Sequence, residues 1–163
     1  MYELAQVNIG RILAPMDSPE LADFVALLDP VNAVADRSPG FVWRLQTEDG
    51  NATAMRVFDD DWLIVNMSVW SSPDALLEYV YGPMHRMVLR RRREWFARVA
   101  EAMTALWWVP TGHRPTVREA EERLVLLRAS GPTPEAFTLR DTFPPPDQPP
   151  VLERRDLIGC DAD

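Results

Sequence analysis

Residues 61–96 read DWLIVNMSVWSSPDALLEYVYGPMHRMVLRRRREWF and predict a strand followed by a long, broken helix. In a strand, successive side chains point to opposite faces. One face is wholly aliphatic and carries Leu63, Val65, Met67 and Val69. The other face mixes aromatic and polar groups: Trp62, Ile64, Asn66, Ser68 and Trp70. Apolar walls with a few polar groups are typical of ligand sites, so this second face predicts a pocket.

Similar patterns predict the rest of the sheet and its helices. Strands are expected at 2–12, 41–46 and 104–109, with 53–58 extending the second of these. A helix is expected to begin at Ser18 and to be interrupted at Asp29-Pro30, because proline lacks the amide proton that a helix interior needs. The second helix is expected to start at Ser72, break at Gly82-Pro83 and reach about Glu101.

The order β-α-β-β-α-β predicts an α+β, ferredoxin-like domain with an antiparallel sheet. In that fold both helices cover one sheet face, so the other face needs a cover. We expect a homodimer in which two sheets pack together as a dimeric α/β barrel.

The C-terminal third predicts an additional helix and a tail. Thr116 and Glu119 have the spacing of a capping box, and the apolar stripe after them ends near Gly131. A short edge strand is expected at 136–139. We therefore divide the chain into a domain at 1–140 and a Pro-rich, extended or disordered tail at 141–163.

Charge and cysteine content narrow the function classes. The 163 residues carry a formal charge of −8, which disfavours nucleic acid as a partner despite the basic run Arg90 to Arg93. The single cysteine, Cys160, cannot form an internal disulfide, and with no signal peptide evident it favours the cytoplasm. No apolar run is long enough to predict a membrane span.

Several segments together resemble a known family: LAQVNI (4–9), PVNAVADRSPGFVWRLQTEDGNAT (30–53), VNMSVW (65–70), HRMVLRRRREWF (85–96) and WWVPTGHRPTVREAEERL (107–124). They are similar to a bacterial family known only as a domain of unknown function. It belongs to the dimeric α/β-barrel superfamily, near the antibiotic-biosynthesis monooxygenases. The resemblance covers about residues 2–140 and implies the ferredoxin-like fold and a dimer. The superfamily includes cofactor-free oxygenases, cyclases, isomerases and haem enzymes, so fold alone does not select a reaction.

His85 is the main catalytic candidate. It shares one helical face with Leu89, Arg92 and Phe96, at i, i+4, i+7 and i+11. An imidazole titrates near neutrality and suits a general acid or base, although a hydrogen-bonded core histidine fits the same pattern. Arg92 is the arginine of this row and a candidate for binding an anionic group.

The polar sheet face supplies the other site candidates. Asn66 is predicted to orient a substrate carbonyl or oxyanion, and a cross-strand structural bond is its alternative. Substrate contact is also predicted for Asn8, Gln6, Trp62, Ser68, Trp70, Trp108 and His113. The second strand offers either Trp43 and Leu45 or Val42, Arg44 and Gln46. For His113, an exposed position at a loop is the favoured interpretation.

Three functions fit this pattern. The first is a small enzyme that acts on an aromatic or polyketide-like compound by proton transfer, without a cofactor. The second is a non-catalytic ligand-binding dimer, and the third is a haem protein with His85 as ligand. With two histidines far apart and one tail cysteine, an ordinary structural zinc site is not predicted.

Overall fold

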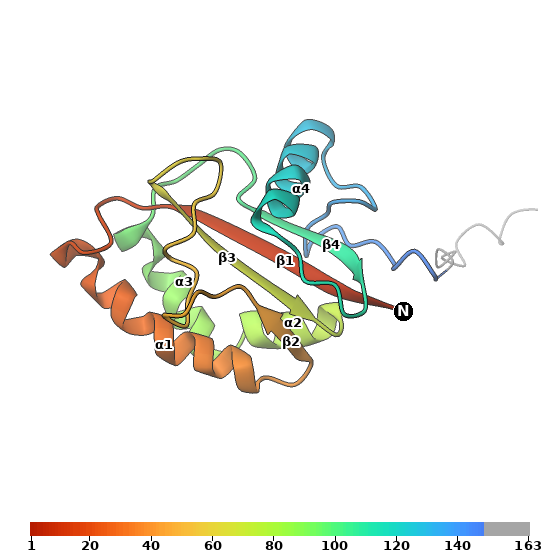
Figure 1. The fold of residues 1–163 in the computed structure, drawn as a ribbon, viewed down its shortest axis with the longest axis horizontal. Coiled ribbons are helices and arrows are strands. Elements are labelled where there is room, and N and C mark those ends of the chain that lie inside the picture. The colour runs from red at the N-terminus through yellow and green to blue at the C-terminus, as the bar shows by residue number, and fades with distance from the viewer. Residues whose placement is uncertain (149–163) are drawn as a thin grey trace, which may run out of the picture.

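A computed structural model describes residues 1–148 and contains a four-stranded antiparallel sheet in the order β2-β3-β1-β4 (Figure 1). The strands are β1 (Tyr2–Arg11), β2 (Phe41–Arg44), β3 (Leu63–Trp70) and β4 (Thr104–Pro110). The helices are the short 3₁₀ turn η1 (Pro19–Leu21), α1 (Ala22–Arg37), α2 (Pro73–Val80), α3 (Pro83–Trp95) and α4 (Val117–Ser130). The ferredoxin-like α+β prediction is confirmed. None of these helices combines the length and apolar character that a bilayer span needs.

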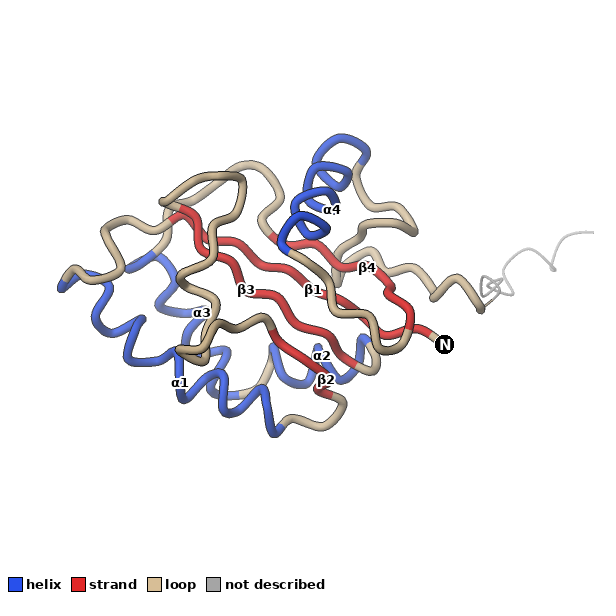
Figure 2. Tube along the Cα trace, in the orientation of Figure 1, coloured by secondary structure: helices blue, strands red, loops and turns tan. Residues whose placement is uncertain are grey.

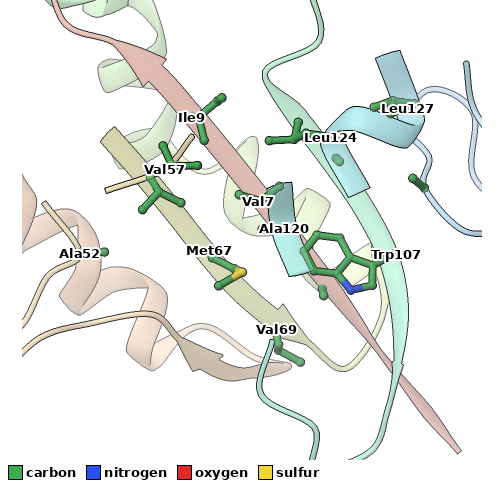
Figure 3. Close-up of a cluster of buried hydrophobic side chains, with 14 of the residues drawn as sticks. Val7, Ile9, Ala52, Val57, Met67, Val69, Trp107, Ala120, Leu124 and Leu127 are labelled. Atoms are coloured by element: carbon green, nitrogen blue, oxygen red, sulfur yellow. The ribbon is translucent and has the colours of Figure 1, made fainter. Parts of the chain in front are cut away.

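The helices divide between the two faces of the sheet. Figure 2 shows α4 lying over β4, apart from α1, α2 and α3, which lie together on the other side. The aliphatic residues of β1, β3 and β4 pack under α4 and the 45–62 segment (Figure 3). This is the core of the molecule, and Val7, Val69 and Leu124 are each 0% exposed in it.

The aliphatic sheet face is therefore not bare, and the reason given for a sheet-to-sheet dimer is wrong. Ala120, Leu124 and Leu127 of α4 fill the place that a second subunit was expected to take. The helix itself was predicted, but its position over the sheet was not. The homodimer stays a prediction.

Helix α1 runs through Pro30 without the interruption that the sequence predicted. A proline costs one helical hydrogen bond and bends the helix, but it need not end it. Phe24 and Ala35, one on each side of Pro30, are both buried. This packing holds the two halves in one helix.

Further boundaries differ from the prediction, and β2 ends at Arg44 rather than at residue 46. Residues 53–58 form turns rather than a strand, and Phe58 and Asp59 have positive φ values of 53° and 51°. Helix α3 ends at Trp95, well before Glu101, because the Ala97 amide donates to the Arg11 carbonyl at the end of β1. The expected edge strand at 136–139 is reduced to two isolated bridges, Leu106–Phe137 and Thr133–Ala136.

The first part of the predicted tail packs against the domain. The indole Nε1 of Trp108 donates to the Phe143 carbonyl at 2.8 Å, and the Phe143 ring packs on Phe137. Residues 141–148 are irregular, and the rest of the predicted tail, including Cys160, lies outside the described residues.

Candidate functional site

A cavity of about 540 Å³ lies between the polar face of the sheet and helices α1, α2 and α3. Its walls are mainly apolar and include Phe24, Leu28, Ile64, Val88 and Phe96. Gln6 and Asn8 from β1 and Asn66 and Ser68 from β3 also line it. Alternation places these side chains here, because β1 and β3 turn their aliphatic residues to the opposite face.

A directed chain of hydrogen bonds crosses the floor of the cavity. The Trp70 indole N–H donates to the Ser68 hydroxyl at 2.9 Å, and the hydroxyl donates to Gln6 Oε1 at 3.0 Å. An indole nitrogen can only donate, so the direction of the Trp70–Ser68 bond is determined. The oxygen of the Gln6 amide is thereby engaged, and its NH₂ group remains as a donor.

Asn8 and Asn66 are directly opposite each other on β1 and β3. Both side chains are exposed and both line the cavity. Neither forms a side-chain hydrogen bond with another described residue, so the cross-strand structural bond considered for Asn66 is not formed. The two amides are available to a ligand.

His85 lies at the start of α3 and is partly buried. Its Nδ1 lies 3.1 Å from the Val80 carbonyl oxygen, which can only accept, so Nδ1 carries the proton. Burial lowers the pKa of His85 below its usual 6.5, and the bond to Val80 opposes this shift. The ring is therefore neutral near pH 7, and Nε2 holds the lone pair that a general base needs.

Tyr79 connects His85 to the cavity floor. Its ring stacks on Trp70 with centroids 5.1 Å apart and packs against the His85 ring at 5.2 Å. Burial raises the pKa of the Tyr79 phenol to about 12, so it stays protonated near pH 7. Tyr79 and His85 also border a second depression beside Ser38 and Met87.

The structure brings together seven of the ten residues that the sequence singled out. Gln6, Asn8, Asn66, Ser68, Trp70, His85 and Arg92 all line the cavity. The sequence left two sets of second-strand residues as alternatives, and Arg44 from one of these sets lines the cavity as well. Their contact with a substrate remains a prediction.

The other three lie elsewhere. Trp62 precedes β3 in a turn where its amide donates to Asp60 Oδ1, and its side chain is 47% exposed. Trp108 is held under Phe137 and Phe143. His113 is an exposed loop residue whose Nε2 lies 2.7 Å from Glu119 Oε2, on the α4 side of the molecule.

The sequence analysis missed several polar or aromatic wall residues, among them Arg11, Phe24, Asn32, Tyr79 and Arg93. Tyr79 had a signal, because it lies six residues before His85 beside the Gly82-Pro83 break. Asn32 and Phe24 had none, since α1 was expected to break between them. Within residues 1–148 there is no group of three His, Cys, Asp or Glu side chains that could hold a metal ion.

Comparison with sequence families decides where the chain belongs. A family described as "Domain of unknown function (DUF3291)" matches residues 3–153. The chain belongs to this family. The resemblance stated from the sequence is confirmed, and DUF3291 carries no described activity. Among curated proteins, none matches the chain.

Several solved structures are similar to this DUF3291 chain over about two thirds of its length. SnoaB, a cofactor-independent oxygenase from Streptomyces nogalater, is 21% identical, with a TM-score of 0.46, over 71% of this chain and 97% of SnoaB. A protein from Chloroflexus aurantiacus J-10-fl that is assigned to the antibiotic biosynthesis monooxygenases is 16% identical, with a TM-score of 0.47, over 69% and 97% of the two chains. A conserved Methanosarcina mazei Go1 protein is 10% identical, with a TM-score of 0.48, over 67% and 92%.

Proposed function

We propose that this chain is a small-molecule enzyme that removes a proton from an aromatic or polyketide-like substrate, with His85 as the general base. The observation that carries the proposal is the hydrogen bond from His85 Nδ1 to the Val80 carbonyl. This bond fixes the tautomer and leaves Nε2 unprotonated, in a side chain that lines the cavity.

The amides on the sheet suit the charge that such a proton transfer creates. Removing a proton next to a carbonyl, or from a phenol, places negative charge on an oxygen. The NH₂ groups of Gln6, Asn8 and Asn66 can donate to that oxygen, and preorganised donors of this kind lower the barrier. Trp70 and Tyr79 offer flat surfaces on which an aromatic substrate can stack.

Oxygenation without a cofactor is the specific reaction that we favour. A deprotonated, electron-rich carbon can itself reduce O₂, so the protein supplies only the base, the orientation and the exclusion of water. Conversion of a ring CH₂ to a ketone then consumes one O₂ and releases one water. Isomerisation or cyclisation would use the same proton transfer and no O₂.

The test uses an anthrone as probe, because its ring CH₂ is acidic and its carbanion reacts with O₂. His85→Ala is compared with the wild type by oxygen uptake and by absorbance of the ketone product. We expect His85→Ala to lose roughly two orders of magnitude in turnover, the usual scale for general acid–base catalysis. His113→Ala is the matched control, since this second histidine lies away from the cavity, and it should keep wild-type turnover.

The same samples distinguish the alternatives. Quenching of tryptophan fluorescence reports ligand binding whether or not a reaction follows. Binding with no turnover by the wild type supports the ligand-binding alternative and overturns cofactor-free oxygenation of an anthrone-like substrate. Equal turnover by His85→Ala and wild type removes His85 from the mechanism. A Soret band after addition of haemin supports the haem alternative.

A further inference from the structure

The charged side chains around the cavity all have the same sign. Arg11, Arg44, Arg92 and Arg93 line it, and no aspartate or glutamate does so within residues 1–148. This is unexpected in a chain whose formal charge is −8. A cavity lined by one sign of charge raises the local concentration of ligands of the opposite sign.

Two of the four arginines are already neutralised. Arg11 pairs with Asp60 at 3.0 Å, and Arg44 pairs with Asp36 at 2.7 Å. Neither Asp60 nor Asp36 lines the cavity. Arg11 and Arg44 therefore hold the wall in place and are not available to a ligand.

Arg92 and Arg93 differ, because neither has a carboxylate within 4.0 Å among the described residues. The acidic partners nearby are taken by Arg91, which binds Asp23 at 2.6 Å and Glu94 at 2.9 Å. The pKa of Arg93 is lowered by partial loss of hydration and by the charges of Arg98 and Arg92. An anion would relieve this repulsion.

The distance between the base and these arginines follows from the helix. His85 and Arg92 lie seven residues apart on one face of α3, which at 1.5 Å per residue is about 10 Å along its axis. Trp70 and Tyr79 lie at the His85 end of the cavity. Phe96 and Ala97 follow Arg93 at the other end.

We propose that the ligand of this cavity is an aromatic acid whose carboxylate or phosphate group binds Arg92 and Arg93, about 10 Å from the atom that faces His85. An arginine guanidinium binds either group through two parallel hydrogen bonds. This proposal shares one assumption with the proposed function, namely that the cavity is the ligand site. It holds for an enzyme or for a binding protein.

The test compares three ligands with one ring system: 2-naphthoate, 2-naphthyl phosphate and 2-naphthylmethanol. Their dissociation constants are measured by calorimetry and by tryptophan quenching at low and high salt. We expect at least one anion to bind the wild type roughly tenfold or more tightly than the alcohol, which is the scale of one charge-assisted contact. The preference should shrink at high salt.

Variants locate the contact. Arg92→Gln and Arg93→Gln should each weaken binding of the anion several-fold, and the double variant should bind anion and alcohol equally. Arg90→Gln is the matched control, because Arg90 is also exposed on α3 but does not line the cavity. It should keep the wild-type preference. Circular dichroism of each variant verifies that α3 remains folded.

Each outcome decides the proposal. The anion that binds more tightly shows whether the group is a carboxylate or a phosphate. The proposal is overturned if the wild type binds all three ligands equally or binds none of them. It is also overturned if the double variant keeps the preference for the anion. His85→Ala should leave the anion preference unchanged, so loss of the catalytic proposal would not affect this one.

Discussion

His85 donates its Nδ1 proton to the carbonyl oxygen of Val80, five residues earlier, across the break between α2 and α3. Gly82-Pro83 produces this break, and without it the two residues would lie in one continuous helix, where the Val80 carbonyl would bond to Met84. The break thus frees a carbonyl to orient the imidazole. The residue that orients the candidate base is part of the backbone and cannot be removed by mutation.

The first prediction concerns stability in acid. Burial lowers the pKa of folded His85, so between 6.5 and that lower value the unfolded chain binds a proton that the folded chain does not. His85 therefore makes stability fall as the pH falls through this range, by at most about 1.4 kcal/mol per pH unit. His85→Gln should show a smaller loss of free energy of unfolding between about pH 7.5 and about pH 5.5, measured with urea.

The control for this prediction is His113→Gln. His113 is exposed in a loop, so its replacement should leave the contribution of His85 in place. A wild-type and a His85→Gln protein with parallel pH profiles would show that the His85 ring titrates as it does in the unfolded chain.

The second prediction concerns the hydrogen-bonded chain on the cavity floor. Ser68→Ala leaves the Trp70 indole N–H, in a side chain that is 0% exposed, and the Gln6 oxygen without their partner. A buried polar group without a partner costs about 1–3 kcal/mol. Thermal or urea unfolding should therefore show a loss of that size.

A double-mutant cycle with Trp70→Phe separates this effect from lost packing. In the Trp70→Phe protein the indole donor is already gone, so Ser68→Ala should cost less there than in the wild type. Two additive substitutions would mean that the Trp70–Ser68 bond contributes nothing measurable to stability.

Much of this site could be predicted because strands obey a two-residue period. Alternation alone placed Asn66, Ser68 and Trp70 on one face, and helical spacing placed His85 and Arg92 on another. Both periods are local and depend only on the chain near each residue. The alternation failed at Trp62 because the strand begins one residue later, where Asp60 caps the preceding turn.

The remaining features depend on contacts between distant segments. The position of α4 is stabilised by burial against β4 and β1, and its own sequence shows only that one of its faces is apolar. Phe24 and Asn32 reach the cavity because α1 continues through Pro30, an outcome decided by tertiary packing. Local rules cannot predict results of this kind.

The third prediction concerns Gly10, where β1 passes under the Phe96 ring. A Cβ at this position would lie 2.8 Å from Phe96 Cδ1 and 2.9 Å from Cε1. The ring cannot move freely, because it packs edge-on against Phe24 at 5.1 Å. Gly10→Ala should cost about 1–3 kcal/mol by overpacking and, since Phe96 lines the cavity, should weaken binding of the naphthalene ligands.

Phe96→Leu tests the cause of that loss. A smaller side chain at 96 makes room for the new methyl group, so the double variant should be more stable than the sum of the two single effects predicts. Strict additivity would show that Gly10→Ala acts through the backbone and not through the Phe96 ring.

The fourth prediction tests whether α4 takes the place of a second subunit on the aliphatic face. Leu124 is 0% exposed and its neighbour Val125 is 54% exposed, so the two residues form a matched pair on one helix. Leu124→Ala should cost about 2–5 kcal/mol in urea unfolding, as for other buried leucines. Val125→Ala should stay within about 0.5 kcal/mol of the wild type. Equal, small effects of both variants, together with a dimeric mass by light scattering, would mean that α4 is not packed on the sheet and that this face binds another copy of the chain.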